Sequence, residues 1–301
     1  MFKAVKWIVA SAMAVSVASA AVCDDIKELK IGLLPIPAES PEALAQSFQN
    51  MADNLGKRLG VPAKIFVSPS FNALIESLAS KRLDMAFFGA EGYVAMKEQG
   101  MQVVPIAKAI HFGRVHYKSS IIVRADSGIN SVADLKGKTF AFVAPTSTSG
   151  GLAPLYMLHQ NGVATADLKR ILYTGNQEAS MLAVKNGKVD AAAVADHYWE
   201  YWKKAGLISF DSYDDKSDKI VNGDLKIIAA MSVPEMPMVV RSDLDKDSIE
   251  KLKSGLLSLP EGTLGKTGFA GDISGFAPTA DSDYTIVEDM KKIGAKNSAK
   301  K

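Results

Sequence analysis

FAFVAPTSTSGGLAP, residues 140–154, contains the signals that decide the fold class. An apolar run over residues 138–143 predicts a β-strand, and residues 150–161 predict an α-helix that ends at Gly162. Hydroxyl residues and two glycines join the two elements. Such a strand–loop–helix unit is the building block of α/β folds.

Strand and helix signals alternate on both sides of this unit. Ser40 and Pro41 supply an N-cap and a first-turn proline for a helix that ends at Gly60. Further strands are predicted at residues 30–35, 63–67, 85–88, 103–109, 119–124 and 189–194, and further helices at 71–80 and 178–186. This order predicts an α/β fold with largely parallel sheets.

Two segments indicate that the chain forms two lobes. Residues 111–117 and 227–237 each pass from an apolar run through charged or turn residues to another apolar run. A chain that crosses to a second lobe and returns has this pattern. We therefore predict one lobe from residues 21–112 plus 234–301 and a second from 113–233, with residues 211–224 as a polar surface loop.

The first twenty residues have the pattern of a secretory signal peptide. Two lysines precede a short apolar run, and Ala18-Ser19-Ala20 fits an A-x-A cleavage site. Cys23 suggests a lipoprotein, but Val22 stands where lipoprotein signals have a small residue, so we favour cleavage after Ala20 and a periplasmic product. The single cysteine cannot form an internal disulfide.

The charge balance argues against a nucleic-acid partner. The chain has 35 basic and 33 acidic residues, and the leader holds two of the basic ones, which leaves 33 of each. The pI of 8.4 therefore reflects the leader. Some of the remaining basic charge lies in residues 291–301, which we expect to form a frayed, solvated end.

The hydroxyl loop indicates an anion site. Hydroxyls and backbone N–H groups at the positive end of a helix form a neutral pocket for an anion, and glycines allow close approach. The alternative is a helix N-cap within a flexible serine loop. No Gly-Lys-Ser/Thr follows, so the loop is not a P-loop.

The order of motifs resembles the phosphate/phosphite/phosphonate substrate-binding family of ABC transporters. The resemblance covers roughly residues 29–290 and rests on Ser-Thr-Ser-Gly at 147–150 before Pro154, and on segments 83–89, 117–124, 187–193, 275–278 and 283–284. It implies a two-lobed type II periplasmic binding fold with a small phosphorus oxyanion between the lobes. It also implies an ABC permease as membrane partner.

By position, the resemblance implies a ligand site formed by Phe71, Tyr117, Ser147, Thr148, Ser149, Gln177, Asp196 and His197. The three loop hydroxyls would hold the phosphorus-bound oxygens. Tyr117 has the place of a ligand-contacting tyrosine, although an ordinary strand aromatic fits equally well. His197 stands where aminophosphonate binders have an acid, and a side-wall or solvent role remains open for it.

Three positions depart from the family pattern. Phe71 replaces an aromatic that is often tyrosine, so it can shape a pocket but cannot donate a hydrogen bond. Gln177 replaces a histidine; its amide can donate but carries no charge, and a plain helix-start role also fits. Met236 stands where aminophosphonate binders have an acid. The ligand is therefore expected to be small or apolar-substituted, without an amine.

Asp196 has two readings. Related binders of small phosphorus oxyanions have an aspartate here that faces the ligand. A carboxylate only accepts hydrogen bonds, so it would select a protonated oxyanion, whose O–H can donate to it. The alternative is an N-cap for the aromatic-rich helix that follows.

Catalysis and metal binding find little support in the sequence. His111, His116, His159 and His197 have no spacing typical of a metal site, and no nucleophile–base pair is evident. We expect a monomeric binding protein without cofactor or metal. Two alternatives stay open: a sensor of another oxyanion that partners a histidine kinase, and an enzyme on the same scaffold.

Overall fold

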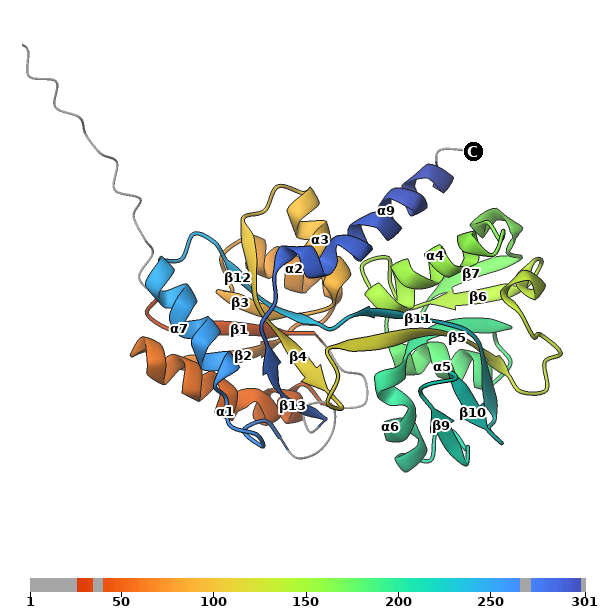
Figure 1. Ribbon diagram of the computed structural model, residues 1–301, viewed down its shortest axis with the longest axis horizontal. Helices are drawn as coiled ribbons and strands as arrows, with labels where there is room; N and C mark the ends of the chain where they lie inside the picture. Colours follow the sequence, from red (N-terminus) through yellow and green to blue (C-terminus); the bar gives the residue numbers. More distant parts are fainter. Residues whose placement is uncertain (1–25, 35–39, 266–271, 299–301) are drawn as a thin grey trace, which may run out of the picture.

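The computed structural model describes residues 26–34, 40–265 and 272–298. These residues form two α/β lobes, each built on its own sheet (Figure 1). The predicted leader, residues 1–20, and Cys23 lie outside the described residues.

The first lobe is built on a six-stranded sheet with the order β13-β4-β12-β3-β1-β2. Helices α1 and α7 pack against each other, and α3 packs against both α2 and α9 (Figure 1). The elements of this lobe are β1 (Leu29–Leu33), α1 (Pro41–Leu59), β2 (Ala63–Val67), α2 (Phe71–Ala79), β3 (Met85–Phe87), α3 (Ala90–Glu98), β4 (Val103–His111), β12 (Pro237–Arg241), α7 (Lys246–Leu257), β13 (Ile273–Ala277), the 3₁₀ turn η5 (Asp281–Tyr284) and α9 (Thr285–Ser298).

The second lobe is built on a five-stranded sheet with the order β11-β5-β8-β6-β7 and a separate two-stranded hairpin. Its elements are β5 (His116–Arg124), η1 (Val132–Leu135), β6 (Thr139–Phe142), the π-helical turn η2 (Thr148–Leu152), α4 (Ala153–Gln160), η3 (Thr165–Asp167), β7 (Arg170–Tyr173), α5 (Gln177–Lys185), β8 (Ala191–Ala195), η4 (Asp196–Tyr198), α6 (Trp199–Lys204), β9 (Ser212–Asp214), β10 (Lys219–Val221) and β11 (Leu225–Pro234).

Both main sheets are mixed, which corrects the expectation of largely parallel sheets. β1 runs parallel to β2 and β3, and β6 runs parallel to β7 and β8. In contrast, β4 is antiparallel to β12, and β5 is antiparallel to β11. The reason is the connection between lobes: in each sheet the strand of one crossover lies beside the strand of the other, so the two must run in opposite directions.

The chain crosses between the sheets twice. β4 ends at His111 and β5 begins at His116, while β11 ends at Pro234 and β12 begins at Pro237. The first crossover contains a tight turn in which Phe112 has φ 49° and Gly113 has φ 72°. The division of the chain after residues 112 and 233 stays a prediction.

Helix α1 has the N-cap, the C-terminal glycine and the buried face that its sequence predicts. The Ser40 hydroxyl accepts a hydrogen bond from Ala43 N at 3.1 Å, and Gly60 ends the helix with φ 75°. One face of the helix is buried in the core, as its apolar spacing predicts: Leu44, Phe48, Met51 and Leu55.

Two segments are more ordered than the sequence indicates. Residues 211–224 contain the β9–β10 hairpin rather than only a loop, and Lys118 Nζ pairs with Asp218 Oδ1 at 2.5 Å to hold it against β5. The tail forms helix α9 up to Ser298, and Lys291 pairs with Glu91 and Glu98, both at 2.8 Å.

Helix α9 also contacts η2 and α4 of the second lobe (Figure 1). In the described ranges, no helix has both the length and the apolar character that a membrane span requires.

Candidate functional site

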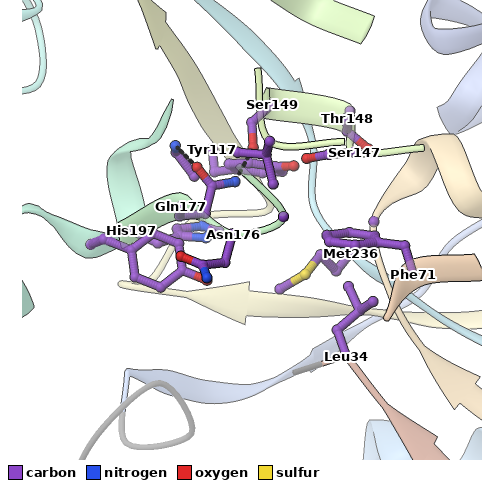
Figure 2. A pocket seen from close by; sticks show the side chains of 15 residues that line it. Leu34, Phe71, Tyr117, Ser147, Thr148, Ser149, Asn176, Gln177, His197 and Met236 are labelled. Atoms are coloured by element: carbon purple, nitrogen blue, oxygen red, sulfur yellow. Dashed lines mark hydrogen bonds between the residues drawn. The ribbon is translucent and has the colours of Figure 1, made fainter. Parts of the chain in front are cut away.

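A cavity with about 540 Å³ of empty space, part of it open to solvent, lies between the two lobes. Figure 2 shows side chains from both lobes converging on it. Its wall is formed by Leu34, Phe71, Gly89, Tyr117, Val143, Ser147, Thr148, Ser149, Gly175, Asn176, Gln177, Ala195, His197, Tyr198 and Met236. Of the eight residues predicted for the site, seven line this cavity and Asp196 does not.

The hydroxyl loop folds into the start of a helix. Ser147 is the N-cap of η2, and its Oγ accepts a hydrogen bond from Gly150 N at 3.1 Å. Gly151 is required by space, because a Cβ there would lie 2.1 Å from Ala144 O. The backbone thus presents three consecutive hydroxyls to the cavity, and Ser147, Thr148 and Ser149 are no more than 2% exposed.

Thr148 connects the two lobes at the cavity wall. Its Oγ1 accepts a hydrogen bond from Glu91 N, at the start of α3, at 2.9 Å. Gly89 lies so close that a Cβ there would be 3.0 Å from Thr148 Oγ1. Because the oxygen already accepts this bond, the Thr148 hydroxyl proton can be directed to a ligand.

Gln177 orients Ser149. Its Nε2 donates to Ser149 Oγ at 3.2 Å, and its Oε1 accepts from Ala195 N at 3.0 Å. Ser119 Oγ donates to Ser149 O at 2.7 Å, which fixes the loop from the strand side. Gln177 occupies one acceptor position of the Ser149 hydroxyl oxygen. The hydroxyl proton of Ser149 can therefore act as a donor.

Tyr117 stacks on His197, with ring centroids 4.4 Å apart, and its hydroxyl interacts with the hydroxyls of Ser149 and Thr148. Burial raises the pKa of Tyr117 well above its usual value. The phenol therefore stays protonated and acts as a neutral hydrogen-bonding group beside the loop.

Apolar side chains form the wall opposite the hydroxyl loop. Figure 2 shows Leu34, Phe71 and Met236 grouped on that side, and Phe71 is the first residue of α2. None of the described lining residues is lysine, arginine, aspartate or glutamate. The cavity therefore offers neutral donors on one side and an apolar surface on the other.

Asp196 faces other partners. Its side chain is fully buried, Oδ2 accepts from Arg114 Nη2 at 3.0 Å, and Oδ1 accepts from Lys118 N at 2.9 Å. It makes no capping hydrogen bond, since Ala195 is the N-cap of η4. The geometry gives Asp196 neither of the roles expected from the sequence; it ties η4 to the first crossover and β5.

His197 lines the cavity as predicted by position, and the structure adds partners that the sequence did not indicate. Its Nε2 lies 2.8 Å from Glu235 Oε1, and its ring stacks on His111 with centroids 4.0 Å apart. Glu235 is completely buried in the second crossover. A single charge inside the apolar run around Pro234 and Pro237 was the available sequence signal.

His111, His197 and Glu235 also bring one ligand-type atom each within 4.8 Å of one another, a set that sequence spacing did not predict. The donors suit a divalent transition metal. However, the two imidazole rings lie within 20° of parallel and Nε2 of His197 is engaged by Glu235. Parallel rings do not direct their lone pairs to one point, which favours a hydrogen-bonded cluster over coordination.

Asn176 is a further lining residue that sequence reasoning missed. It is the N-cap of α5, and its Oδ1 accepts from Ala179 N at 2.7 Å. The capping bond uses the amide oxygen and leaves the Nδ2 group as the donor of this side chain at the cavity.

Comparisons with known proteins agree on one family. A family model described as "ABC transporter, phosphonate, periplasmic substrate-binding protein" matches residues 33–284. The phosphate-import protein PhnD of Mycolicibacterium smegmatis is 30% identical over 240 residues, which cover 74% of this chain and 70% of that protein. The probable phosphite-binding protein PhnD1 of Prochlorococcus marinus is 29% identical over 208 residues, covering 66% and 69%.

Solved structures share the architecture. The structure of Prochlorococcus marinus PhnD1 in complex with methylphosphonate superposes with a TM-score of 0.70 at 23% identity and covers 88% of this chain and 97% of that one. A phosphonate-transporter binding protein of Pseudomonas aeruginosa gives 0.72 at 22%, covering 90% and 87%. This likeness confirms the two-lobed type II periplasmic binding fold.

Proposed function

Because the chain belongs to the family of periplasmic substrate-binding proteins of phosphonate ABC transporters, we propose that it captures a small phosphorus oxyanion between its lobes. Members of this family are binding proteins rather than enzymes. The ligand itself, and the residues that hold it, are the proposal.

The observation that carries this proposal is the cluster of buried hydroxyls on the cavity wall. Ser147, Thr148 and Ser149 are almost completely buried, and each hydroxyl oxygen accepts a bond from the protein, which allows the hydroxyl proton to be directed to a ligand. Buried donors are stable only when they find acceptors. The three oxygens of a phosphonate or phosphite group would provide them.

Neutral donors suit an anion that must be released again. Hydrogen bonds from neutral groups to a charged oxygen contribute about 1.5–3 kcal/mol each, so several together support tight binding without a buried cation. Tyr117 and Gln177 complete this polar side, and the Asn176 amide adds a donor.

The apolar wall indicates the substituent on phosphorus. Phe71, Leu34 and Met236 face the loop across the cavity, where an amine would find no acid among the described lining residues. A hydrogen or a short alkyl group would be accommodated there. This favours phosphite or methylphosphonate over an aminoalkylphosphonate.

Delivery to an ABC permease follows from the family. We further propose that the leader at residues 1–20 exports the chain, that it acts in the periplasm as a monomer, and that the permease accepts it in the ligand-bound form.

Thermal denaturation with a panel of anions tests the ligand class. Phosphite, methylphosphonate and phosphate should raise the melting temperature, since a ligand that binds only the native state adds about 2.7 kcal/mol at a hundred times its dissociation constant. Methanesulfonate, a tetrahedral anion built on sulfur, is the matched control. If millimolar phosphorus oxyanions leave the melting temperature unchanged, the proposed ligand class is wrong.

A further inference from the structure

An acid–base pair lies directly behind the cavity. His197 lines the cavity and is 5% exposed, and Glu235 is 0% exposed. The His197 Nε2 and Glu235 Oε1 are 2.8 Å apart, and Glu235 Oε2 accepts from Met236 N at 3.2 Å. The carboxylate thus sits one side chain away from the space that the oxyanion would occupy.

The surroundings of the pair contain few compensating charges. Its titratable and charged neighbours come from every element packed against it: His111 on β4, Arg114 in the first crossover, His116 and Tyr117 on β5, Asp196 on η4 and Tyr284 on η5. Arg114 is bonded to Asp196 at 3.0 Å, which offsets its positive charge.

The charge of this pair changes near neutral pH. Burial raises the pKa of Glu235 to about 7, and burial lowers the pKa of His197 to about 4. Near neutral pH His197 is therefore neutral, and Glu235 is either ionised or protonated. With Glu235 ionised, His197 Nε2–H donates to the carboxylate and the pair carries one negative charge; with Glu235 protonated, the pair is neutral overall.

A bound oxyanion changes this balance. A buried negative charge close to a second anion in a medium of low polarity is strongly unfavourable, so the anion favours the protonated pair. We propose that the His197–Glu235 pair sets the charge that the site accepts, because it takes up one proton when the oxyanion binds. This inference rests on the proposed function. His197 touches the ligand, and Glu235 acts through His197 as a positioning residue.

The proton balance is simple. One proton leaves the solvent and joins the N–H proton that the neutral imidazole already carries, so that the pair then holds two protons and no net charge, and no covalent bond is made to the ligand. Binding raises the pKa of the pair above its value in the free protein. Affinity is therefore full below the free value of about 7 and falls as pH rises above it, by up to tenfold per pH unit.

Titration calorimetry of methylphosphonate in two buffers of different ionisation enthalpy measures the proton uptake. Wild type, Glu235→Gln and the surface control Glu200→Gln are compared at pH 6 and pH 8. Since the ligand is the same in all three, its own ionisation cancels in the differences. At pH 8 wild type and Glu200→Gln should take up close to one proton more than Glu235→Gln, and at pH 6 the difference should nearly vanish.

A second variant provides the same test in case Glu235→Gln does not fold. His197→Phe keeps the ring stack on Tyr117 but removes the base, so the buried Glu235 stays protonated in both states and the uptake at pH 8 should again be lost. A purely structural role of the pair would change the affinity of either variant without changing its proton count.

The outcomes separate this inference from the proposed function. If wild type binds methylphosphonate but its proton uptake at pH 8 equals that of the folded variants, the inference is wrong and the function stands. If wild type binds no phosphorus oxyanion at all, the proposed function fails and the inference fails with it.

Discussion

The hydroxyl groups of the loop make hydrogen bonds within the protein, and they are also the proposed donors to the ligand. The sequence left two readings for this loop, a helix cap and an anion site. The structure shows the Ser147 oxygen accepting from Gly150 N, so the capping role is present. It also shows Thr148 and Ser149 accepting from Glu91 and Gln177, roles that no local sequence signal indicates.

Removing these hydroxyls should weaken binding more than folding. Ser147→Ala and Thr148→Ala each delete one hydrogen bond to a charged oxygen, and we expect about ten- to a hundredfold lower affinity for methylphosphonate by calorimetry. Ser147→Ala should also lose about 1 kcal/mol of stability with its cap. Thr165→Ala, an exposed hydroxyl in the same lobe, is the control. Unchanged affinity in both loop variants would leave the loop with a capping role alone.

Asp196→Asn should affect stability rather than the pH dependence of binding. The variant weakens the bond to Arg114 but keeps an acceptor for Lys118 N. Because the Arg114 side chain is 30% exposed, we expect a loss of about 1–2 kcal/mol in chemical denaturation. An affinity profile from pH 6 to pH 9 that becomes flat in this variant would return Asp196 to the ligand site.

Long-range partners explain which residues the sequence could not assign. The Asp196 carboxylate is held by Arg114, 82 positions away, and His197 by Glu235, 38 positions away. Periodicity and capping signals act over a few residues, so they place Ser147 and Gln177 at helix starts but cannot show that the second crossover returns beside η4. The resemblance placed His197 at the site without its acid.

The secondary-structure elements were the part of the structure that the sequence predicted best. The strand β6, the hydroxyl loop and the following helix lie where the sequence predicted them, although the first turn, η2, is π-helical. The hairpin within residues 211–224 was missed because its strands are only three residues long and rich in charge.

Gly151 is the position where the loop element is most sensitive. A Cβ at this residue would lie 2.1 Å from the backbone oxygen of Ala144, which cannot move without shifting the loop. Gly151→Ala should therefore lower the melting temperature and reduce methylphosphonate affinity together. Gly275→Ala, where a Cβ meets nothing within 4 Å, should leave both unchanged. Equal behaviour of the two variants would contradict this account of the loop.

Across the whole molecule, several contacts join the lobes, and one of them lies at the cavity wall. Glu91 N donates to Thr148 Oγ1 at 2.9 Å, the Thr146 hydroxyl lies 3.3 Å from Asn72 Oδ1, and α9 reaches η2 and α4. The two crossovers are short, so a rotation about them would open the cavity to solvent.

Ligand binding should favour this arrangement, in which the two lobes contact each other, over one in which they are rotated apart. Solution scattering should give a smaller radius of gyration with saturating methylphosphonate than without it. The double variant of Ser147→Ala and Thr148→Ala, at the same ligand concentration, should show no decrease. Identical scattering curves for wild type with and without saturating ligand would indicate a rigid pocket.

A crystal structure of the protein with methylphosphonate tests the central claim most directly. We expect one ligand per chain, with its oxygens within hydrogen-bonding distance of the Ser147, Thr148 and Ser149 hydroxyls and of Tyr117. The methyl group should face Phe71 and Met236. Ligand density at another place, or a cavity that stays empty at saturating methylphosphonate, would contradict it.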